Sequence, residues 1–214
     1  MDKDIYIIGA GTYGEAMFEL ALLCGYNPVA YFDDDESKSG QKVMNILILG
    51  KLDSAKFSIA GKNFVVAIGN NKIREKKMLE LINLDANVPS LIHPSANISE
   101  YAYISNVGCY IHANVYIWTK VRIENFCIIS PVVMIAHHSV LKVGCFVSAG
   151  SNIGAGILLD HKSFIGIGST IMTGVKKIGK NTIVGAGSVI IKDISDDKIA
   201  VGNPGRIIKN TYEK

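Results

Sequence analysis

The second half of the chain repeats an aliphatic residue at every sixth position. The series runs from Ile98 to Ile190 and contains sixteen residues, all Ile, Leu or Val, and its phase slips by one residue at about Tyr110 and Lys177. A period of six fits neither an α-helix nor an alternating strand. It is typical of a chain that forms a short strand, turns and repeats, so that three successive repeats close one coil. The pattern predicts a parallel β-helix of about five coils.

The first half alternates apolar runs with amphipathic segments. Strands are expected over residues 5–8, 29–32, 46–49 and 64–68, and helices are expected up to about residue 24 and over residues 72–84. The first strand is followed by Gly9-x-Gly11-x-x-Gly14, and Asp33 follows Gly14 at about the 20-residue spacing of the dinucleotide-binding fingerprint. In that fingerprint, glycines allow a tight turn, a helix N-terminus binds phosphate and an acid binds a ribose or a base.

The first half has room for only half of a dinucleotide-binding fold. About 90 residues precede the repeat, which is enough for one βαβαβ unit, whereas the full fold needs two. We therefore expect a site for one nucleotide diphosphate rather than for NAD. A glycine turn that only packs a helix on a sheet is the alternative, and a solvated turn is the alternative for the acids after Asp33. Substrate-binding residues are expected at Gly11, Thr12, Tyr13, Gly14, Asp33, Asp34, Gly69 and Asn70.

The composition narrows the class of protein further. The 214 residues carry a net charge of +3, from 22 Lys and Arg against 19 Asp and Glu, which is too weak for a nucleic-acid-binding face. Hydrophobic residues make up 49% and charged residues 19%, which excludes a disordered chain. No apolar stretch approaches the roughly 18 residues of a membrane span, and we expect no signal peptide. With four cysteines and no export signal, we expect a reducing, cytoplasmic setting.

Three of the four cysteines follow the repeat. Cys109, Cys127 and Cys145 recur at intervals of one coil, and Ser163 continues the series at the same interval. They are expected to stack along one inner corner of the coils. A metal or redox site is the alternative, but no fourth Cys or His belongs to this column, so we predict packing and no metal.

The two halves together resemble a known family. The glycine fingerprint over Ile7–Gly14, the hexapeptide repeat and the tail Gly202-Asn203-Pro204-Gly205-Arg206 are similar to the sialic acid O-acetyltransferase family, within it to the branch that N-acetylates nucleotide-linked 4-amino-4,6-dideoxy sugars. The resemblance covers essentially the whole chain. It implies an α/β half-Rossmann domain over residues 1–92 that binds the sugar nucleotide, and a left-handed parallel β-helix over residues 93–214 that carries acyl transfer and ends in the tail.

The resemblance also implies partners. Acetyl-CoA is the expected donor, a homotrimer with active sites between subunits is the expected assembly, and bacterial surface glycans such as lipopolysaccharide are the usual destination of the product. Coenzyme A is expected along the groove between neighbouring β-helices. The amine is expected to attack the thioester directly, without an acyl-enzyme, because no nucleophile-and-base spacing is present.

The family's catalytic histidine corresponds to His137. The residue after it in the family is often Glu or Asp, which orients the base, but here it is His138. The orienting group is therefore open, and His138 is a second candidate base. Ser130, seven residues before His137, stands where a polar amide meets the substrate in the family. His112 and His161 are expected to be structural or surface residues, and His161 falls on a different edge of the coils.

The same resemblance places coenzyme A along glycine-rich turns. The pantetheine arm is expected at Gly154, Gly156, Gly166 and Gly168, and the adenine and 3′-phosphate at Gly185, Pro204 and Arg206. Ser148 and Gly150 are expected to offer backbone N–H groups to the oxyanion. Because the repeat itself needs glycine in its turns, packing is the alternative for each of these glycines.

Other functions stay open on the sequence alone. The scaffold could O-acetylate a sialic acid or another sugar hydroxyl, although a hydroxyl needs a stronger base than an amine does. A non-catalytic sugar-nucleotide sensor or assembly scaffold is a candidate from another class. A γ-type carbonic anhydrase needs three zinc histidines, and His137, His138 and His161 lack the expected H-x₄-H spacing.

Overall fold

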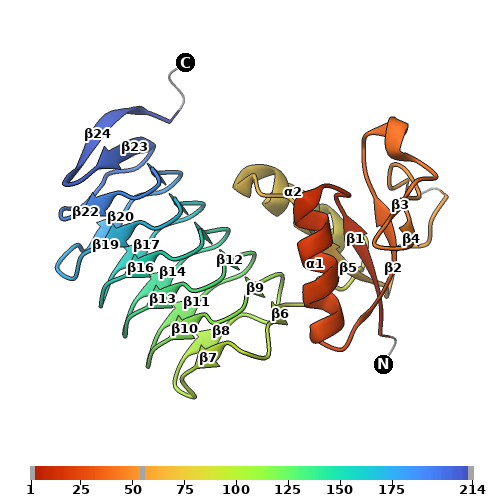
Figure 1. Cartoon of the computed structure of the whole chain (residues 1–214), viewed down its shortest axis with the longest axis horizontal. Helices are drawn as coiled ribbons and strands as arrows, with labels where there is room; N and C mark the ends of the chain where they lie inside the picture. Colours follow the sequence, from red (N-terminus) through yellow and green to blue (C-terminus); the bar gives the residue numbers. More distant parts are fainter. Residues whose placement is uncertain (1–2, 54–55, 212–214) are drawn as a thin grey trace. The chain divides into compact units, whose positions relative to one another are not determined.

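The computed structural model describes residues 3–53 and 56–211, and the chain divides into two compact units, Met1–Leu91 and Ile92–Lys214 (Figure 1). The division lies one residue before the boundary expected from the sequence. Each unit has its own core. Among the described residues, no helix combines the length and apolar character needed to cross a membrane.

The N-terminal unit is built on a three-stranded parallel sheet in the order β2-β1-β5. Its elements are β1 (Asp4–Ile8), α1 (Thr12–Leu23), β2 (Asn27–Phe32), the 3₁₀ turn η1 (Glu36–Lys38), β3 (Lys42–Val43), β4 (Ile46–Leu47), β5 (Asn63–Val66) and α2 (Asn71–Asn83). The apolar runs at residues 5–8, 29–32 and 64–68 form the sheet, and β5 is buried along its whole length, whereas the run at residues 46–49 contributes β4 to a separate pair. The short antiparallel pair β3–β4 turns through Met44 and Asn45, both with positive φ, and β3 was not expected.

The C-terminal unit is a stack of short strands that form three sheets (Figure 1). The first sheet contains β6 (Leu91–Ile92), β9 (Tyr110–Ile111), β12 (Ile128–Ile129), β15 (Phe146–Val147), β18 (Phe164–Ile165), β21 (Ile183–Val184), β23 (Lys198–Gly202) and β24 (Gly205–Asn210). The second contains β7 (Asn97–Ile98), β10 (Tyr116–Ile117), β13 (Met134–Ile135), β16 (Asn152–Ile153), β19 (Thr170–Ile171) and β22 (Val189–Ile190). The third contains β8 (Tyr103–Ile104), β11 (Arg122–Ile123), β14 (Val140–Leu141), β17 (Leu158–Leu159) and β20 (Lys177–Ile178).

The register of these strands follows the six-residue repeat. Ile117 pairs with Ile135, and Ile135 pairs with Ile153, each one coil further along the chain. Each phase slip lengthens its coil by one residue, as in the pairing of Leu159 with Ile178. The repeated aliphatic residues from Ile111 to Ile190 are buried in one continuous core. The parallel β-helix predicted from the repeat is confirmed.

Three corners join the sheets, and they are named here by the sheets they connect. The 1/2 corner contains residues 112–115, 130–133, 148–151, 166–169 and 185–188. The 2/3 corner contains residues 118–121, 136–139, 154–157 and 172–175. The 3/1 corner contains residues 124–127, 142–145, 160–163 and 179–182.

The cysteine column follows the 3/1 corner. Cys127 and Cys145 lie in the ranges given for that corner, and Cys109 lies at the same corner one coil earlier. Cys109, Cys127 and Cys145 are buried and form no disulfide, and Cys145 Sγ lies 3.3 Å from Ser163 Oγ. Burial, together with the neighbouring thiols, raises the pKa of Cys127 well above its usual value. Among the described residues, no group of three or more His, Cys, Asp or Glu side chains could hold a metal ion. Because the three side chains are buried among the aliphatic residues of the core, they act as small apolar packing groups.

Candidate active site

In the N-terminal unit, the expected substrate-binding segments lie at one edge of the sheet. β1, β2 and β5 are parallel neighbours, so the loops after them leave the sheet at the same edge. These loops contain Gly9–Gly11, Asp33–Asp35 and Gly69–Asn70. Open α/β sheets bind ligands at the carboxyl ends of their strands, so this edge is the candidate nucleotide site.

Each of the three glycines of the fingerprint has a different structural role. Gly9 has φ +103°, and a Cβ there would lie 2.9 Å from the Ala67 carbonyl oxygen. A Cβ on Gly14 would collide with the Gly9 carbonyl oxygen, so helix α1 can pack this closely only without one. Beside Gly11, which precedes α1, the space within 4 Å is open. Gly11 is therefore the position where a phosphate can approach the backbone and the N-terminus of α1.

Asp33 holds the glycine loop. Its Oδ2 accepts from the Ala10 N–H at 2.8 Å and pairs with Lys38 Nζ at 3.0 Å, and its Oδ1 accepts from the Asp35 N–H at 2.9 Å. Burial alone raises the pKa of Asp33, but these hydrogen bonds outweigh it and lower the pKa. Asp34 is exposed and has no side-chain partner among the described residues. Asp34 is thus the carboxylate left available to a ligand.

The loop after β5 is held by a residue that the sequence analysis missed. Arg74 on α2 is fully buried, and its guanidinium donates to the carbonyl oxygens of Ile68 and Gly69, both at 3.2 Å, and to Asn71 Oδ1 at 2.8 Å. Asn70 caps α2, and its Oδ1 accepts from two backbone N–H groups at 3.1 Å. Burial raises the pKa of Tyr13, and the charge of Arg74 opposes that rise. Asn70 and Arg74 therefore stabilise the conformation of this loop through hydrogen bonds to its backbone and to the start of α2.

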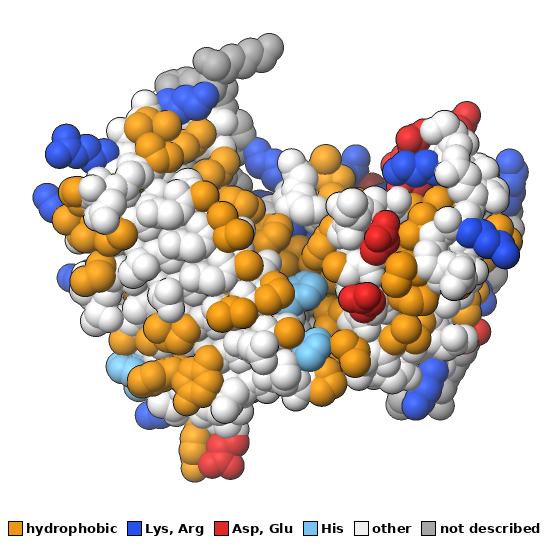
Figure 2. All heavy atoms as spheres, in the orientation of Figure 1, with side chains coloured by type: hydrophobic (Ala, Val, Ile, Leu, Met, Phe, Trp, Pro, Cys, Tyr) orange, Lys and Arg blue, Asp and Glu red, His pale blue; other side chains and the backbone are white. Residues whose placement is uncertain are grey.

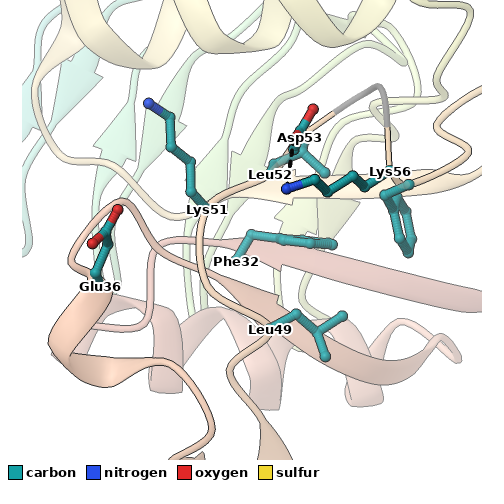
Figure 3. Close-up of a pocket in the computed structure, with 8 residues that line it drawn as sticks. Phe32, Glu36, Leu49, Lys51, Leu52, Asp53 and Lys56 are labelled. Carbon is teal, nitrogen blue, oxygen red and sulfur yellow. Dashed lines mark ion pairs between the residues drawn. The ribbon is translucent and has the colours of Figure 1, made fainter.

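A cavity of about 730 Å³ opens beside the carboxyl end of β2 (Figure 3). Phe32, the last residue of that strand, and Phe57 supply aromatic surface. The rim is charged, with Glu36, Lys51 and an ion pair of 3.6 Å between Lys56 and Asp53. The other residues lining the cavity are Leu49 and Leu52. Because Phe32 directly precedes Asp33, the cavity lies next to the loops that form the candidate nucleotide site.

In the C-terminal unit, His137 and His138 lie together at the 2/3 corner. His137 is half-buried and His138 is exposed, and their Nδ1 atoms are 3.0 Å apart. The His137 ring also lies near the Trp118 ring, with centroids 6.0 Å apart. The coil above holds the backbone of His137, whose carbonyl oxygen accepts from the Gly156 N–H at 2.9 Å. These contacts fix a partly accessible imidazole pair on a rigid scaffold.

The expected coenzyme A glycines fall into two classes. At Gly154, Gly166 and Gly185 a Cβ would press on the next coil, so close stacking requires glycine there. Gly150, Gly156 and Gly168 have φ between +67° and +70° and open space beside them. Only Gly154 and Gly156 share the corner of His137, because the others lie at the 1/2 corner.

Ser130, Ser148 and Gly150 also lie at the 1/2 corner, away from His137 in the same chain. The N–H of Ser148 donates to the Ile165 carbonyl at 2.9 Å, and that of Gly150 to the Pro131 carbonyl at 3.0 Å. The ladder between coils therefore uses both N–H groups that were expected at the oxyanion. Pro204 and Arg206 belong to the β23–β24 hairpin, where Pro204 follows a cis peptide bond and Arg206 is exposed.

The other histidines have local partners. His161 Nδ1 lies 2.7 Å from Asp160 Oδ1 at the 3/1 corner, on a different edge from His137 as expected. His112 is buried at the 1/2 corner, and burial, with a smaller effect of His93, lowers its pKa to about 4. His112 is therefore an uncharged packing residue at neutral pH.

Comparison with known proteins adds to this geometry. Residues 4–81 match the PglD N-terminal domain family. A GDP-perosamine N-acetyltransferase of Escherichia coli O157:H7 is 27% identical over 188 residues, 85% of this chain and 82% of that protein. A putative acetyltransferase of Saccharomyces cerevisiae is 47% identical over 58 residues, but the match covers only 29% of that protein.

Two solved structures match both units. PerB from Caulobacter crescentus, solved with CoA and GDP-perosamine, has a TM-score of 0.85 and 28% identity over 96% of this chain and 97% of its own. The acetyltransferase domain of PglB from Neisseria gonorrhoeae has a TM-score of 0.89 and 27% identity over 96% and 100%. The expected fold, a Rossmann-like domain followed by a left-handed parallel β-helix, is confirmed. The expected resemblance of this chain to nucleotide-amino-sugar N-acetyltransferases of the hexapeptide family is confirmed, and its residues 4–81 match the PglD N-terminal domain family.

Proposed function

We propose that this protein transfers the acetyl group of acetyl-CoA to the C4 amine of a nucleotide-linked 4-amino-4,6-dideoxy sugar. The observation that carries the proposal is the combination, in one chain, of an open glycine loop at the N-terminus of α1 and a partly accessible His137 beside the open backbone of Gly156. The similarity to proteins named as GDP-perosamine N-acetyltransferases supports the same reaction class.

The sugar nucleotide binds to the N-terminal unit in this proposal. Its diphosphate lies against the backbone of Gly11 and Thr12, where the α1 dipole and free N–H groups favour negative charge. Asp34 is the free carboxylate for a ribose or base, and Phe32 and Phe57 give the adjoining cavity a surface on which a base can stack. Gly9, Gly14 and Asp33 then act by holding the loop rather than by touching the ligand.

His137 is the general base of the proposed reaction. The amine nitrogen attacks the thioester carbonyl carbon, a C–N bond forms, and His137 takes the proton that the amine loses. The C–S bond then breaks, and coenzyme A leaves as a thiolate that is protonated by the imidazolium or by water. A positioned base of this kind contributes about 10²–10⁴-fold to the rate. Holding both substrates in one place supplies much of the remainder.

The open glycines fit a bound acetyl-CoA better than the closed ones do. Gly156 offers unobstructed backbone at the corner of His137, and Gly150 and Gly168 offer it at the 1/2 corner. One chain keeps these two corners apart, but a homotrimer brings the edge of one β-helix next to the edge of another. Exposed apolar side chains at both corners, Trp118, Val132 and Ile167, support such an assembly. Figure 2 shows hydrophobic side chains at several places on the surface of the C-terminal unit.

A thiol-release assay tests the proposal. Purified protein receives acetyl-CoA and a panel of GDP-, UDP- and dTDP-linked 4-amino-4,6-dideoxy sugars, with free sialic acid as a hydroxyl acceptor. His137→Ala is compared with His161→Ala, because both change a histidine at the same place in the repeat. We expect CoA release with an amino sugar, lost in His137→Ala and kept in His161→Ala.

The assay separates the alternatives. Release only with sialic acid assigns O-acetylation instead. Activity that survives in His137→Ala refutes the assigned base. If the protein binds a nucleotide sugar but neither binds CoA nor releases thiol with any acceptor, the enzyme proposal fails and a binding or scaffold role replaces it.

A further inference from the structure

The reaction proposed above assigns no role to the side chain of His138, yet this side chain contacts the proposed base directly. Its Nδ1 lies 3.0 Å from Nδ1 of His137, and the two rings are perpendicular with centroids 5.1 Å apart. Within the described part of the chain, this is the only side-chain hydrogen bond that His137 makes, and no carboxylate reaches it. Whatever orients the imidazole of His137 must therefore include His138.

Two imidazole Nδ1 atoms at this distance hold one proton between them. One nitrogen donates and the other accepts, because two lone pairs or two N–H groups repel each other. The uncharged rings are thus in opposite tautomers. Either His137 carries the Nδ1 proton and has its lone pair on Nε2, or His138 does.

Solvent exposure favours the first arrangement. The ring whose Nδ1 accepts carries its own proton on Nε2, and that N–H needs a hydrogen-bond partner. His138 is exposed, so water can satisfy its Nε2–H, whereas His137 is half-buried beside Trp118. The favoured tautomer leaves the lone pair on Nε2 of His137.

The backbone conformation of His138 belongs to the repeat and not to the site. Its φ is +63°, in the left-handed region, and the equivalent positions of the neighbouring coils, Lys120 and Gly156, have φ +56° and +70°. The His138 N–H donates to the Thr119 carbonyl oxygen at 3.2 Å, as the turn requires. At this position, the side chain and not the backbone conformation distinguishes the turn from its neighbours. Gly, Asn and Asp tolerate such a φ, so they are suitable replacements.

Few charged or titratable groups surround the pair. The turn below contributes Lys120, and the turn above, residues 154–156, contributes none. The adjacent strands present Tyr116 and Arg122, and Arg122 pairs with Glu124 at 3.7 Å. These groups are the same in every variant below, so differences between variants report the residue at position 138.

We propose that His138 is the positioning residue of His137, an uncharged acceptor that keeps a proton on His137 Nδ1 and leaves Nε2 free. This rests on the proposed function, in which His137 is the base. When the C–N bond forms, the amine proton moves to His137 Nε2, and the C–S bond breaks with the electron pair leaving on sulfur. The Nδ1 proton stays between the rings. If the imidazole pair binds a proton before the amine attacks, that proton occupies Nε2 of His137. His137 then cannot accept the amine proton, so the protonated pair is inactive.

Three variants at position 138 test the proposal. His138→Gly removes the acceptor, His138→Asn replaces it with an uncharged amide oxygen, and His138→Asp replaces it with a carboxylate. We expect His138→Gly to lower kcat by about tenfold or more, within the 10²–10⁴-fold that a base supplies, with little change in KM. His138→Asn is expected to restore most of kcat. His138→Asp is expected to be active with its acid limb of kcat/KM shifted to higher pH than in His138→Asn, because a neighbouring anion raises the pKa of an imidazole.

Nitrogen-15 NMR of histidine-labelled protein gives a readout that does not need substrate. We expect the uncharged His137 to carry its proton on Nδ1 and the uncharged His138 to carry its proton on Nε2, and His138→Gly to lose that preference at His137. The inference is overturned if His137 is protonated on Nε2, or if His138→Gly matches the wild type in kcat and pH profile. If instead His137→Ala retains activity, the proposed function loses its base, while the NMR result still decides how the two rings are paired.

Discussion

His137 and His161 stand at the same place in two turns of the β-helix, each two residues after an inward-facing aliphatic side chain. His161 has the arrangement that usually orients a base, with its Nδ1 2.7 Å from the Asp160 carboxylate. His137 has only a second imidazole at 3.0 Å. By hydrogen-bond chemistry alone, His161 is a stronger candidate for a catalytic base than His137.

The residues that surround the two histidines in the adjacent coils favour His137 over His161 as the base. Asp160 also binds Lys177 at 2.9 Å, and Lys177 binds Asp196 at 3.1 Å, so His161 sits at the end of a charged ladder along the 3/1 corner. His137 lies beside the Trp118 ring and below the open backbone of Gly156. The role expected of a histidine in this repeat therefore depends on the turns above and below it. The four predictions that follow test this difference between turns, in order of decreasing effect.

The largest expected effect is on catalysis. His137→Ala should lower the rate of thiol release by about 10²–10⁴-fold, because it removes the proposed base. His161→Ala should leave that rate unchanged, since its partners are structural. Rates measured at saturating substrate, with circular dichroism as a check of folding, test both variants. Equal losses in the two would erase the distinction between the turns.

The second effect concerns a buried histidine in a third turn. Burial lowers the pKa of His112 to about 4 from 6.5. The unfolded chain therefore binds a proton at higher pH than the folded chain does, so stability present above pH 6.5 is lost as pH falls toward 4. The loss is about 3 kcal/mol at about 1.36 kcal/mol per pKa unit. Urea unfolding across this range, in the wild type and in His112→Gln, measures it, and the variant should show a flatter dependence.

The third effect separates the closed and open glycines above His137. A Cβ at Gly154 would lie 2.5 Å from the Thr173 nitrogen, so Gly154→Ala should destabilise the protein by about 1–3 kcal/mol through overpacking. Gly156 has open space but φ +70°, so Gly156→Ala should cost about 1–2 kcal/mol from backbone strain. Denaturant midpoints give the comparison. The affinity for CoA should fall more in Gly156→Ala than its small loss of stability explains.

The smallest effect lies in the charged ladder. Burial alone raises the pKa of Asp160, but hydrogen bonds from Lys177 and His161 outweigh it and lower the pKa to about 2. Because the folded pKa is below the unfolded value of 3.8, the stability is present above pH 4 and disappears as pH falls toward 2. Asp160→Asn should lose about 1 kcal/mol at pH 7, given solvent screening. Unfolding at pH 7 and at pH 2.5 checks this, and the two proteins should converge at the lower pH.

Much of the fold was predictable because its signals are local and repeated. The period of six locates every strand pair from β9 to β22, and the fingerprint Gly9-x-Gly11-x-x-Gly14 locates the first turn and helix. The β3 strand was missed because its two residues carry no periodicity. Arg74 was missed because a charged residue in a helix normally faces water, and the acceptors that compensate its burial, among them the carbonyl groups of Ile68 and Gly69, are set by the tertiary structure.

Individual residues of the candidate site could be predicted from the sequence, but which of them lie together could not. His137 followed from the resemblance, and Gly11 from the fingerprint. The fingerprint spacing favoured Asp33 as the ligand-binding acid, whereas the loop geometry assigns it three contacts within the protein and leaves Asp34 exposed. The coenzyme A glycines look equivalent along the chain, whereas the coils divide them between two corners and between closed and open positions.

The sequence by itself determined the repeat, its inward aliphatic side chains and the glycine loop, because these depend on spacing along the chain and on backbone geometry at single residues. Tertiary structure alone decided which groups meet: the Nδ1 atoms of His137 and His138, the ladder that engages His161, and the N–H groups that the coils take from Ser148 and Gly150. The physical reason is that stacking brings residues of successive coils into contact, so a turn acquires its chemistry from the coils above and below it.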